Sequence, residues 1–276
     1  MIKDIVLPLQ FSDHRDAAAD FALSVSVAFN AHIAAIGFAY EPVLPALDMG
    51  NGIPLDVIDA EREDNKKAAA ETISRFEKSA RLGGVTSESR VIEASFAGAG
   101  HAFGEIARSF DLSVVGQSDP KAMSNDLIIE GALFDSGRPV LVVPYIQSAG
   151  LKLDRVTVCW DGSRNAARAV NDAMPLLSRA KAIDVVTVIG EKDKVDALQN
   201  AAIAQHLSRH GLSVELRMIA VGNLDVANAV LSDAADRGTD LIVMGGYGHS
   251  RLREFVLGGA TRGILGTMTV PTLMSH

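Results

Sequence analysis

The order of sequence features in the first half of the chain recurs in the second half. An apolar run at residues 5–8 precedes an Ala-rich helical stretch at 16–29, and a run at 156–160 precedes a similar stretch. Later, residues 111–116 match residues 240–245, and each segment is followed by a Pro-led apolar run. Internal repetition of this kind predicts two copies of one structural unit rather than a single large domain.

The junction between the two copies is expected near residues 145–152. This short segment holds Gln147, Ser148 and Gly150 and shows no hydrophobic periodicity, as is typical of a linker. The chain of 276 residues is long enough for two domains of ordinary size. We therefore predict one domain at residues 1–146 and a second at 152–276.

Each half alternates short apolar runs with helical periods, which predicts an α/β fold. Several of the apolar runs have no polar face, as expected for strands of a parallel sheet that is covered by helices on both sides. Such an alternation predicts two tandem, doubly wound, Rossmann-like sheets. In the second half the predicted strands are 154–159, 183–188, 212–220, 240–244 and 270–274, and the predicted helices are 163–181, 192–210, 223–237 and 259–267.

The first half carries one insertion that the second half lacks. Residues 41–64 include Pro42, Pro45 and Pro54 and lead into a long polar helix predicted at about 56–82. A connection of this length is usually either a lid over a site or a packing element. The sequence leaves both interpretations open.

Charge and composition exclude several classes of partner. The net charge is −8, from 26 basic and 34 acidic residues, which disfavours a nucleic-acid backbone as a partner. The single cysteine, Cys159, permits neither an intramolecular disulfide nor a cysteine zinc site. His206 and His210 share a helix face but lack a third ligand, so no metal site is predicted.

One uncharged stretch, residues 21–40, has the length of a membrane span. Asn30, His32 and Gly37 interrupt it, so we predict the end of a helix followed by a buried strand. No secretory leader is recognisable at the start of the sequence. We expect a cytoplasmic protein without a membrane partner.

A glycine-rich segment follows the fourth predicted strand of the second half. Two residues separate Gly245 from Gly248, and nine separate Gly248 from Gly258, where a helix is predicted to begin. Glycines let the backbone approach a phosphate closely, and the N–H groups of a helix N-terminus attract an anion. No Gly-Lys-Ser/Thr follows, so the segment is not a Walker A loop. A simple tight turn is the alternative interpretation of the spacing.

Three separated segments together make the pattern specific. The glycine spacing, the aspartate-led strand at residues 240–245 and the Asp161-Gly162-Ser163 turn after the first strand resemble the universal stress protein (UspA) family. The resemblance covers essentially the whole chain, once in each half. It implies a five-stranded parallel sheet of order 3-2-1-4-5 in each half, a role in stress adaptation, and adenine-nucleotide binding where the glycine loop is kept.

The resemblance also implies an adenosine site in the second half, with ATP or a related adenine nucleotide as the ligand and Mg²⁺ as its companion ion. Cys159, Trp160 and Asp161, at the end of the first strand, would lie against the adenosine. Val188 would offer its backbone to the adenine edge. A Trp at position 160 is unusual for the family, and packing into the core is the other interpretation of this side chain.

The remaining implied contacts follow the glycine loop. Met244, Gly245 and Gly248 would line the path of the ribose and the phosphates. The phosphates would then meet the backbone N–H groups of a second segment, which comprises Gly258, Gly259 and Ala260.

One residue of this second segment departs from the family pattern, which has Ser or Thr where Gly259 stands. The loss of that hydroxyl costs about 1 kcal/mol of binding free energy. Thr261 is expected to supply a hydroxyl in its place.

The first half departs from the family pattern more strongly. Gln10 stands where Asp161 stands in the second half, Gly116 is kept, and Asp119 replaces the second glycine. The Asp119 carboxylate would repel a phosphate at this place. We therefore predict that the first half is a degenerate universal-stress domain without an ATP site.

Family dimers that join through their last strands suggest how the two halves associate. The apolar runs at 140–143 and 270–274 are the candidate edges, and pairing them would bury two strand edges that otherwise invite aggregation. We predict an internal pseudo-dimer of the two halves. The sequence is also compatible with further association into a homodimer.

The sequence supports two functional hypotheses of different classes. The first is a nucleotide-dependent binder or switch with at most slow ATP turnover, because no general base and no lysine for the γ-phosphate are apparent. The second is an interaction module of the same fold that binds no nucleotide. An adenylyl- or pyrophosphatase-type enzyme is a third alternative, which lacks a recognisable set of activating residues.

Overall fold

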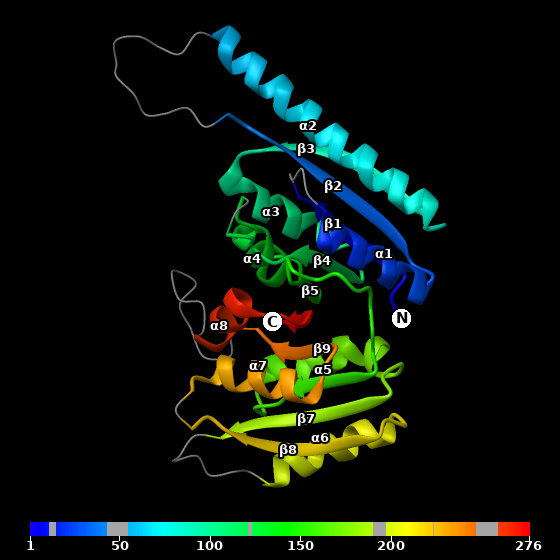
Figure 1. Ribbon diagram of the computed structural model, residues 1–276, viewed down its shortest axis with the longest axis vertical. Helices are drawn as coiled ribbons and strands as arrows, with labels where there is room; N and C mark the ends of the chain where they lie inside the picture. Colours follow the sequence, from blue (N-terminus) through cyan, green and yellow to red (C-terminus); the bar gives the residue numbers. More distant parts are fainter. Residues whose placement is uncertain (11–14, 43–54, 121–122, 190–196, 223, 247–258) are drawn as a thin grey trace.

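The computed structural model describes residues 1–10, 15–42, 55–120, 123–189, 197–222, 224–246 and 259–276. Its strands form one ten-stranded sheet of order β3-β2-β1-β4-β5-β10-β9-β6-β7-β8. Figure 1 shows the two halves stacked along the long axis, with the first half (blue to green) above the second. Each half has the strand order 3-2-1-4-5, which confirms the predicted fold class.

The first half contributes five strands and four helices. The strands are β1 (Asp4–Leu9), β2 (His32–Tyr40), β3 (Ser87–Ala94), β4 (Leu112–Gly116) and β5 (Val140–Val143). The helices are α1 (Ala17–Phe29), α2 (Leu55–Leu82), α3 (Phe96–Ala107) and α4 (Asp126–Phe134). The uncharged stretch 21–40 is the end of α1 followed by β2, as predicted.

The second half repeats this order. Its strands are β6 (Arg155–Cys159), β7 (Ala182–Ile189), β8 (Val214–Ala220), β9 (Leu241–Gly245) and β10 (Thr272–Ser275). Its helices are α5 (Arg164–Leu177), α6 (Ala197–Arg209), α7 (Val226–Arg237) and α8 (Gly259–Thr267). The prediction extended α5 to residue 181, but the helix ends at Leu177. Lys181 N, just before β7, donates instead to Leu153 O, which precedes β6 (2.9 Å).

The last strands of the two halves join the sheet in its middle. β5 and β10 pair antiparallel, with Val140 opposite Met274 and Val142 opposite Thr272. All the other strand pairs of the sheet are parallel. The predicted pairing of the two last strands is thus confirmed, and it relates the halves as two units of an internal pseudo-dimer.

Helices cover both faces of the sheet and enclose two cores. On one face α1, α2, α5 and α6 bury a core that includes Phe21, Phe76 and Leu176. On the other face α3, α4, α7 and α8 bury a second core that includes Phe103, Leu133 and Ile264. In Figure 1 α2 runs along the outer edge of the first half, beside β2 and β3.

Side-chain caps determine where the main helices begin. The side chain of Asp16 accepts from Ala19 N before α1, that of Ser163 accepts from Ala166 N before α5, and that of Asp225 accepts from Asn228 N before α7. Each cap satisfies a backbone donor that a helix start otherwise leaves without a partner. Ser12, which matches Ser163 in the repeat, lies outside the described residues.

The repeat is visible in matching hydrogen bonds as well as in topology. Asp111 precedes β4, and its Oδ2 accepts from the N–H groups of Lys3 (2.7 Å) and Asp4 (3.1 Å). Asp240 precedes β9, and its Oδ2 accepts from Asp154 N (2.9 Å) and Arg155 N (3.0 Å). Each aspartate therefore ties the start of one strand to the start of its neighbour.

A buried ionic cluster distinguishes the second half from the first. Asp184 in β7 is 1% exposed, and both of its carboxylate oxygens lie 2.9 Å from Arg155 Nη1. Arg237 Nε donates to Asp184 Oδ2 (3.3 Å). The matching residue in β2 is Ala34, because Ala34 pairs with Glu88 as Asp184 pairs with Glu215. The first half therefore has no carboxylate at this place.

None of the helices in the described part of the chain combines the length and the apolar character that crossing a membrane requires.

Candidate functional site

Three of the predicted site residues meet at the carboxyl ends of β6, β7 and β9. Met244 belongs to the core beneath α7 and α8, and Cys159 and Val188 are partly buried against the same core. All three side chains therefore lie on one face of the sheet. The carboxyl edge of an open parallel sheet is where ligands of such folds bind.

Trp160 lies on the opposite face from these three residues. Its side chain packs, partly buried, against the core beneath α5 and α6, and its backbone N donates to Val186 O (2.8 Å). The Trp160 side chain therefore packs against the core, as the second interpretation of this residue expects.

Asp161 shapes the turn between β6 and α5. Its Oδ1 accepts from Ser163 N (2.9 Å), and Ser163 Oγ in turn accepts from Ala166 N (3.1 Å). Gly162 between them has φ +72°, a conformation that favours glycine. The turn keeps the exposed Asp161 carboxylate at the end of β6, beside Cys159.

Gly245 is required by close packing of backbone against backbone. A Cβ added at Gly245 would lie 2.6 Å from Ala166 N and 2.7 Å from the carbonyl carbon of Asn165. The first turn of α5 therefore lies directly against the end of β9. No other residue type fits here without moving α5.

The phosphate-binding part of the prediction falls partly outside the described residues. Gly248 and Gly258 lie in the undescribed segment 247–258. Half of the 41–64 insertion lies in another undescribed segment, 43–54, and residues 55–64 form the start of α2. Gly259 begins α8, Ala260 follows it, and Thr261 is buried at 3% exposure. α8 packs on α7, since a Cβ on Gly263 would lie 2.6 Å from Ala227 Cβ.

In the first half the corresponding edge is filled by the half's own side chains. The Gln10 side-chain amide covers Gly116 at the place where a Cβ of that glycine would point. Asn125 Nδ2 donates to Gly116 O (3.0 Å) from the start of α4. Gly116 corresponds to Gly245, and Gln10 follows β1 as Asp161 follows β6. At the carboxyl edge of the sheet, Gln10 therefore lies against Gly116 in the first half, whereas the backbone of α5 lies against Gly245 in the second half.

The loop after β4 is tied to the N-terminus of α4. Ser118 Oγ lies 2.6 Å from Asp126 Oδ1, and Asn125 N donates to Ser118 Oγ (2.9 Å). The first-turn carboxylate of Asp126 and the hydroxyl of Ser118 thus occupy the region where α4 would otherwise attract an anion.

The Cys159 thiol is unsuited to nucleophilic chemistry. Burial, with further contributions from the carboxylates of Asp161 and Asp233, raises the pKa of Cys159 to about 12. A thiol with this pKa stays protonated near neutral pH, and the thiolate is the reactive form. Cys159 therefore acts as a small apolar contact at the edge of the site.

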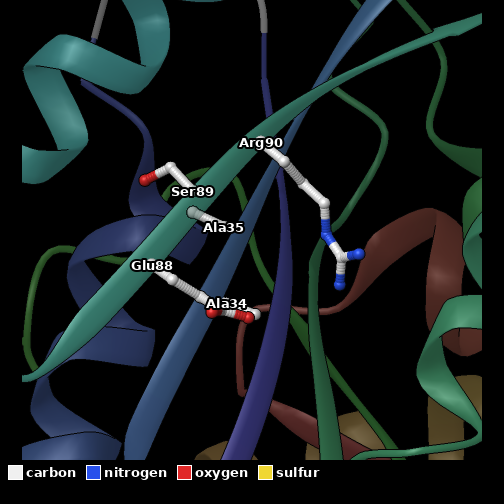
Figure 2. Close-up of a pocket in the computed structure, with 5 residues that line it drawn as sticks. All are labelled: Ala34, Ala35, Glu88, Ser89 and Arg90. Atoms are coloured by element: carbon white, nitrogen blue, oxygen red, sulfur yellow. The ribbon is translucent and has the colours of Figure 1, made fainter.

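The cavity drawn in Figure 2 lies elsewhere, on β2 and β3 of the first half. It has a volume of about 180 Å³ and is lined by Ala34, Ala35, Glu88, Ser89 and Arg90. Figure 2 shows Glu88 and Arg90 extending to one side of β3 and Ser89 to the other. Ala34 is the counterpart of Asp184, so the cavity lies where the second half has its buried carboxylate. No predicted site residue lines it.

Sequence analysis missed the residues that contact Gly246, the last described residue before the undescribed segment 247–258. Asn165 Nδ2 donates to Gly246 O (2.6 Å), and His276 Nδ1 lies 3.1 Å from the same oxygen. Gly246 N donates to Ser275 O (2.8 Å). These residues are far apart in sequence, and no spacing rule links them to the glycine loop.

Comparisons with known proteins concern the family and the fold of the chain. Residues 152–276 match the model of the universal stress protein family. A universal stress protein of Synechocystis sp. is 28% identical over 138 residues, which are 49% of this chain and 46% of the relative. The match therefore spans less than half of that relative's length.

Solved structures show the same fold over nearly the whole chain. A universal stress protein from Archaeoglobus fulgidus superposes with a TM-score of 0.75 at 17% identity, covering 99% of this chain and 97% of that one. A putative universal stress protein from Pseudomonas aeruginosa gives a TM-score of 0.64 at 13% identity, with coverage of 99% and 93%. Residues 152–276 are thus similar to the universal stress protein family, and the chain as a whole has the fold of these solved structures.

Proposed function

We propose that the second half binds ATP or a related adenine nucleotide at the carboxyl edge of its strands. The chain would then act as a nucleotide-dependent binder in the stress response. The observation that carries this proposal is the convergence of Cys159, Val188 and Met244 on one face of the sheet. The three come from different strands. The family resemblance predicts contacts to the adenosine for Cys159 and Val188, and a place along the path of the ribose and the phosphates for Met244.

The contrast between the halves supports placing the nucleotide in the second one. In the first half Gln10 covers Gly116, and Asp126 and Ser118 occupy the N-terminus of α4. A nucleotide there would have to displace satisfied polar groups and approach Asp119, and both changes oppose binding. In the second half Gly259 begins α8 and has no described atom within 4 Å of the place of a Cβ.

Turnover is expected to be slow. Cys159 is protonated, and the one ionisable group that the described site residues add is the Asp161 carboxylate, which accepts a hydrogen bond in a turn. Phosphoryl transfer needs positioned cationic groups and a positioned nucleophile. A binder or switch fits these residues better than a dedicated enzyme.

The number of nucleotides bound per chain tests the proposal. Equilibrium dialysis of ligand-free protein against saturating Mg²⁺-ATP is expected to give one nucleotide per chain, because one half carries the site. Two per chain would contradict the closure of the first half. None would favour the alternative, an interaction module of the same fold that binds no nucleotide.

A further inference from the structure

The first half makes a crossed contact with the second half at the base of the glycine loop. A Cβ added at Gly246 would lie 2.8 Å from Leu133 Cδ2, 3.3 Å from its Cδ1 and 3.5 Å from its Cγ. These three nearest atoms all belong to one side chain, in α4 of the first half. Leu133 is 2% exposed in the core beneath α4 and α8, so its side chain can make room for a Cβ only by repacking within that core.

The same contact is made in reverse on the other side of the pseudo-dimer. Gln117 corresponds to Gly246, because Gln117 N donates to Val143 O (2.7 Å) as Gly246 N donates to Ser275 O (2.8 Å). Gln117 Nε2 donates across the junction to Leu265 O in α8 (2.8 Å), and Gln117 is 3% exposed. In each half, therefore, the residue after the fourth strand meets the last helix of the other half.

These two contacts hold two different parts of the candidate site. Leu133 packs on Gly246, directly after the predicted contact residue Gly245. Gln117 bonds to Leu265 in α8, the helix whose first residues, Gly259 and Ala260, are predicted to meet the phosphates. Both contacts come from the half that has lost its own site.

From this arrangement we propose that the first half positions the nucleotide site of the second half, with Leu133 as the positioning residue for Gly246 at the end of β9. The inference rests on the proposed nucleotide site. It assigns the degenerate half a role in setting the affinity of its partner domain, and Leu133 acts through Gly246 without touching the ligand.

The requirement for glycine at position 246 makes the inference testable, since Gly246 does not adopt a positive φ. An alanine there is therefore opposed by Leu133 and not by backbone strain. Gly246→Ala is expected to weaken Mg²⁺-ATP binding by about fivefold to tenfold, as overpacking displaces residue 246 and the end of β9. In the Leu133→Ala background the same substitution is expected to change affinity by less than about twofold, because the obstructing side chain is gone.

The control for a purely structural effect is Ile129→Ala, which removes a 2%-exposed side chain from the same helix and the same core. It is expected to lower the melting temperature about as much as Leu133→Ala does while leaving ATP affinity unchanged. A second readout is hydrogen exchange at the Gly246 amide, which donates to Ser275 O. Leu133→Ala is expected to accelerate this exchange more than Ile129→Ala does.

Titration calorimetry measures ATP affinity in wild type, Gly246→Ala, Leu133→Ala and the double variant. Hydrogen exchange at the Gly246 amide is compared between Leu133→Ala and Ile129→Ala. An equal loss of affinity from Gly246→Ala in both backgrounds would overturn the inference. If wild type binds no ATP, the proposed function fails. The positioning role is then tested by hydrogen exchange alone. Equal exchange rates at the Gly246 amide in Leu133→Ala and Ile129→Ala would overturn it.

Discussion

Replacing Asp184 with alanine, the residue that the first half has at the same place, is expected to lower the free energy of unfolding by about 3 kcal/mol. Arg155 Nη1 lies 2.9 Å from both oxygens of the buried Asp184 carboxylate, and Arg237 Nε lies 3.3 Å away. Arg217 is held by its own bidentate pair with Asp233 (2.8 and 2.7 Å). Without Asp184, Arg155 keeps its charge and loses its carboxylate partner.

The estimate takes the lower end of the range for a broken buried pair, because the Arg155 side chain is 28% exposed and water reaches part of it. Asp154→Ala is the matched control, since it removes a carboxylate 2.6 Å from Lys181 with both side chains largely exposed. Water and salt screen that pair, so its loss is expected to change the free energy of unfolding far less than the loss of Asp184 does. Urea unfolding of the two variants measures the difference, and equal losses would contradict a structural role for the cluster.

Gly131→Ala is the substitution expected to disturb helix packing most. A Cβ at Gly131 would overlap the carbonyl group of Gly100 in α3 and lie 3.0 Å from its Cα. A Cβ at Gly104 would meet Gly131 O at 2.6 Å, so the two helices approach backbone to backbone. A backbone cannot rotate away as a side chain can, so α3 and α4 must separate, at a cost of about 3 kcal/mol.

Gly266→Ala provides the control for this prediction. Gly266 is also inside a helix, α8, but it is exposed and meets no described atom within 4 Å of a Cβ. Alanine is favoured over glycine inside a helix by up to about 1 kcal/mol, so this variant is expected to be neutral or slightly more stable. Thermal unfolding followed by circular dichroism compares the two, and a Gly131→Ala protein as stable as wild type would show that α3 and α4 do not meet as described.

The fold could be predicted from the sequence because its signals are local and occur twice. The apolar runs identified every strand of the second half to within two residues, and the edge runs at 140–143 and 270–274 indicated the junction of the halves. Helix ends were less accurate, since caps such as Asp225 and Ser178 decide them and the helical period does not.

The site was predictable only where a residue's place follows from its strand. Cys159, Val188 and Met244 are each the last or the next-to-last residue of a parallel strand, so the topology alone brings them to one edge. The packing of Leu133 on Gly246 and the covering of Gly116 by Gln10 depend on how distant segments meet, which spacing does not encode. Asp184 left a signal, a charge within an apolar strand run, but its three arginine neighbours come from β6, β8 and α7.

Titration calorimetry of Mg²⁺-ATP into ligand-free wild type and Gly248→Asp tests the central claim most directly. The substitution copies Asp119 of the first half into the second, and Gly266→Asp adds the same charge at an exposed position of α8 as a control. We predict micromolar binding by wild type and by the control, and at least about tenfold weaker binding by Gly248→Asp, from charge repulsion at the phosphates. Equal affinity in all three proteins, or no binding by wild type, would contradict a nucleotide site in the second half.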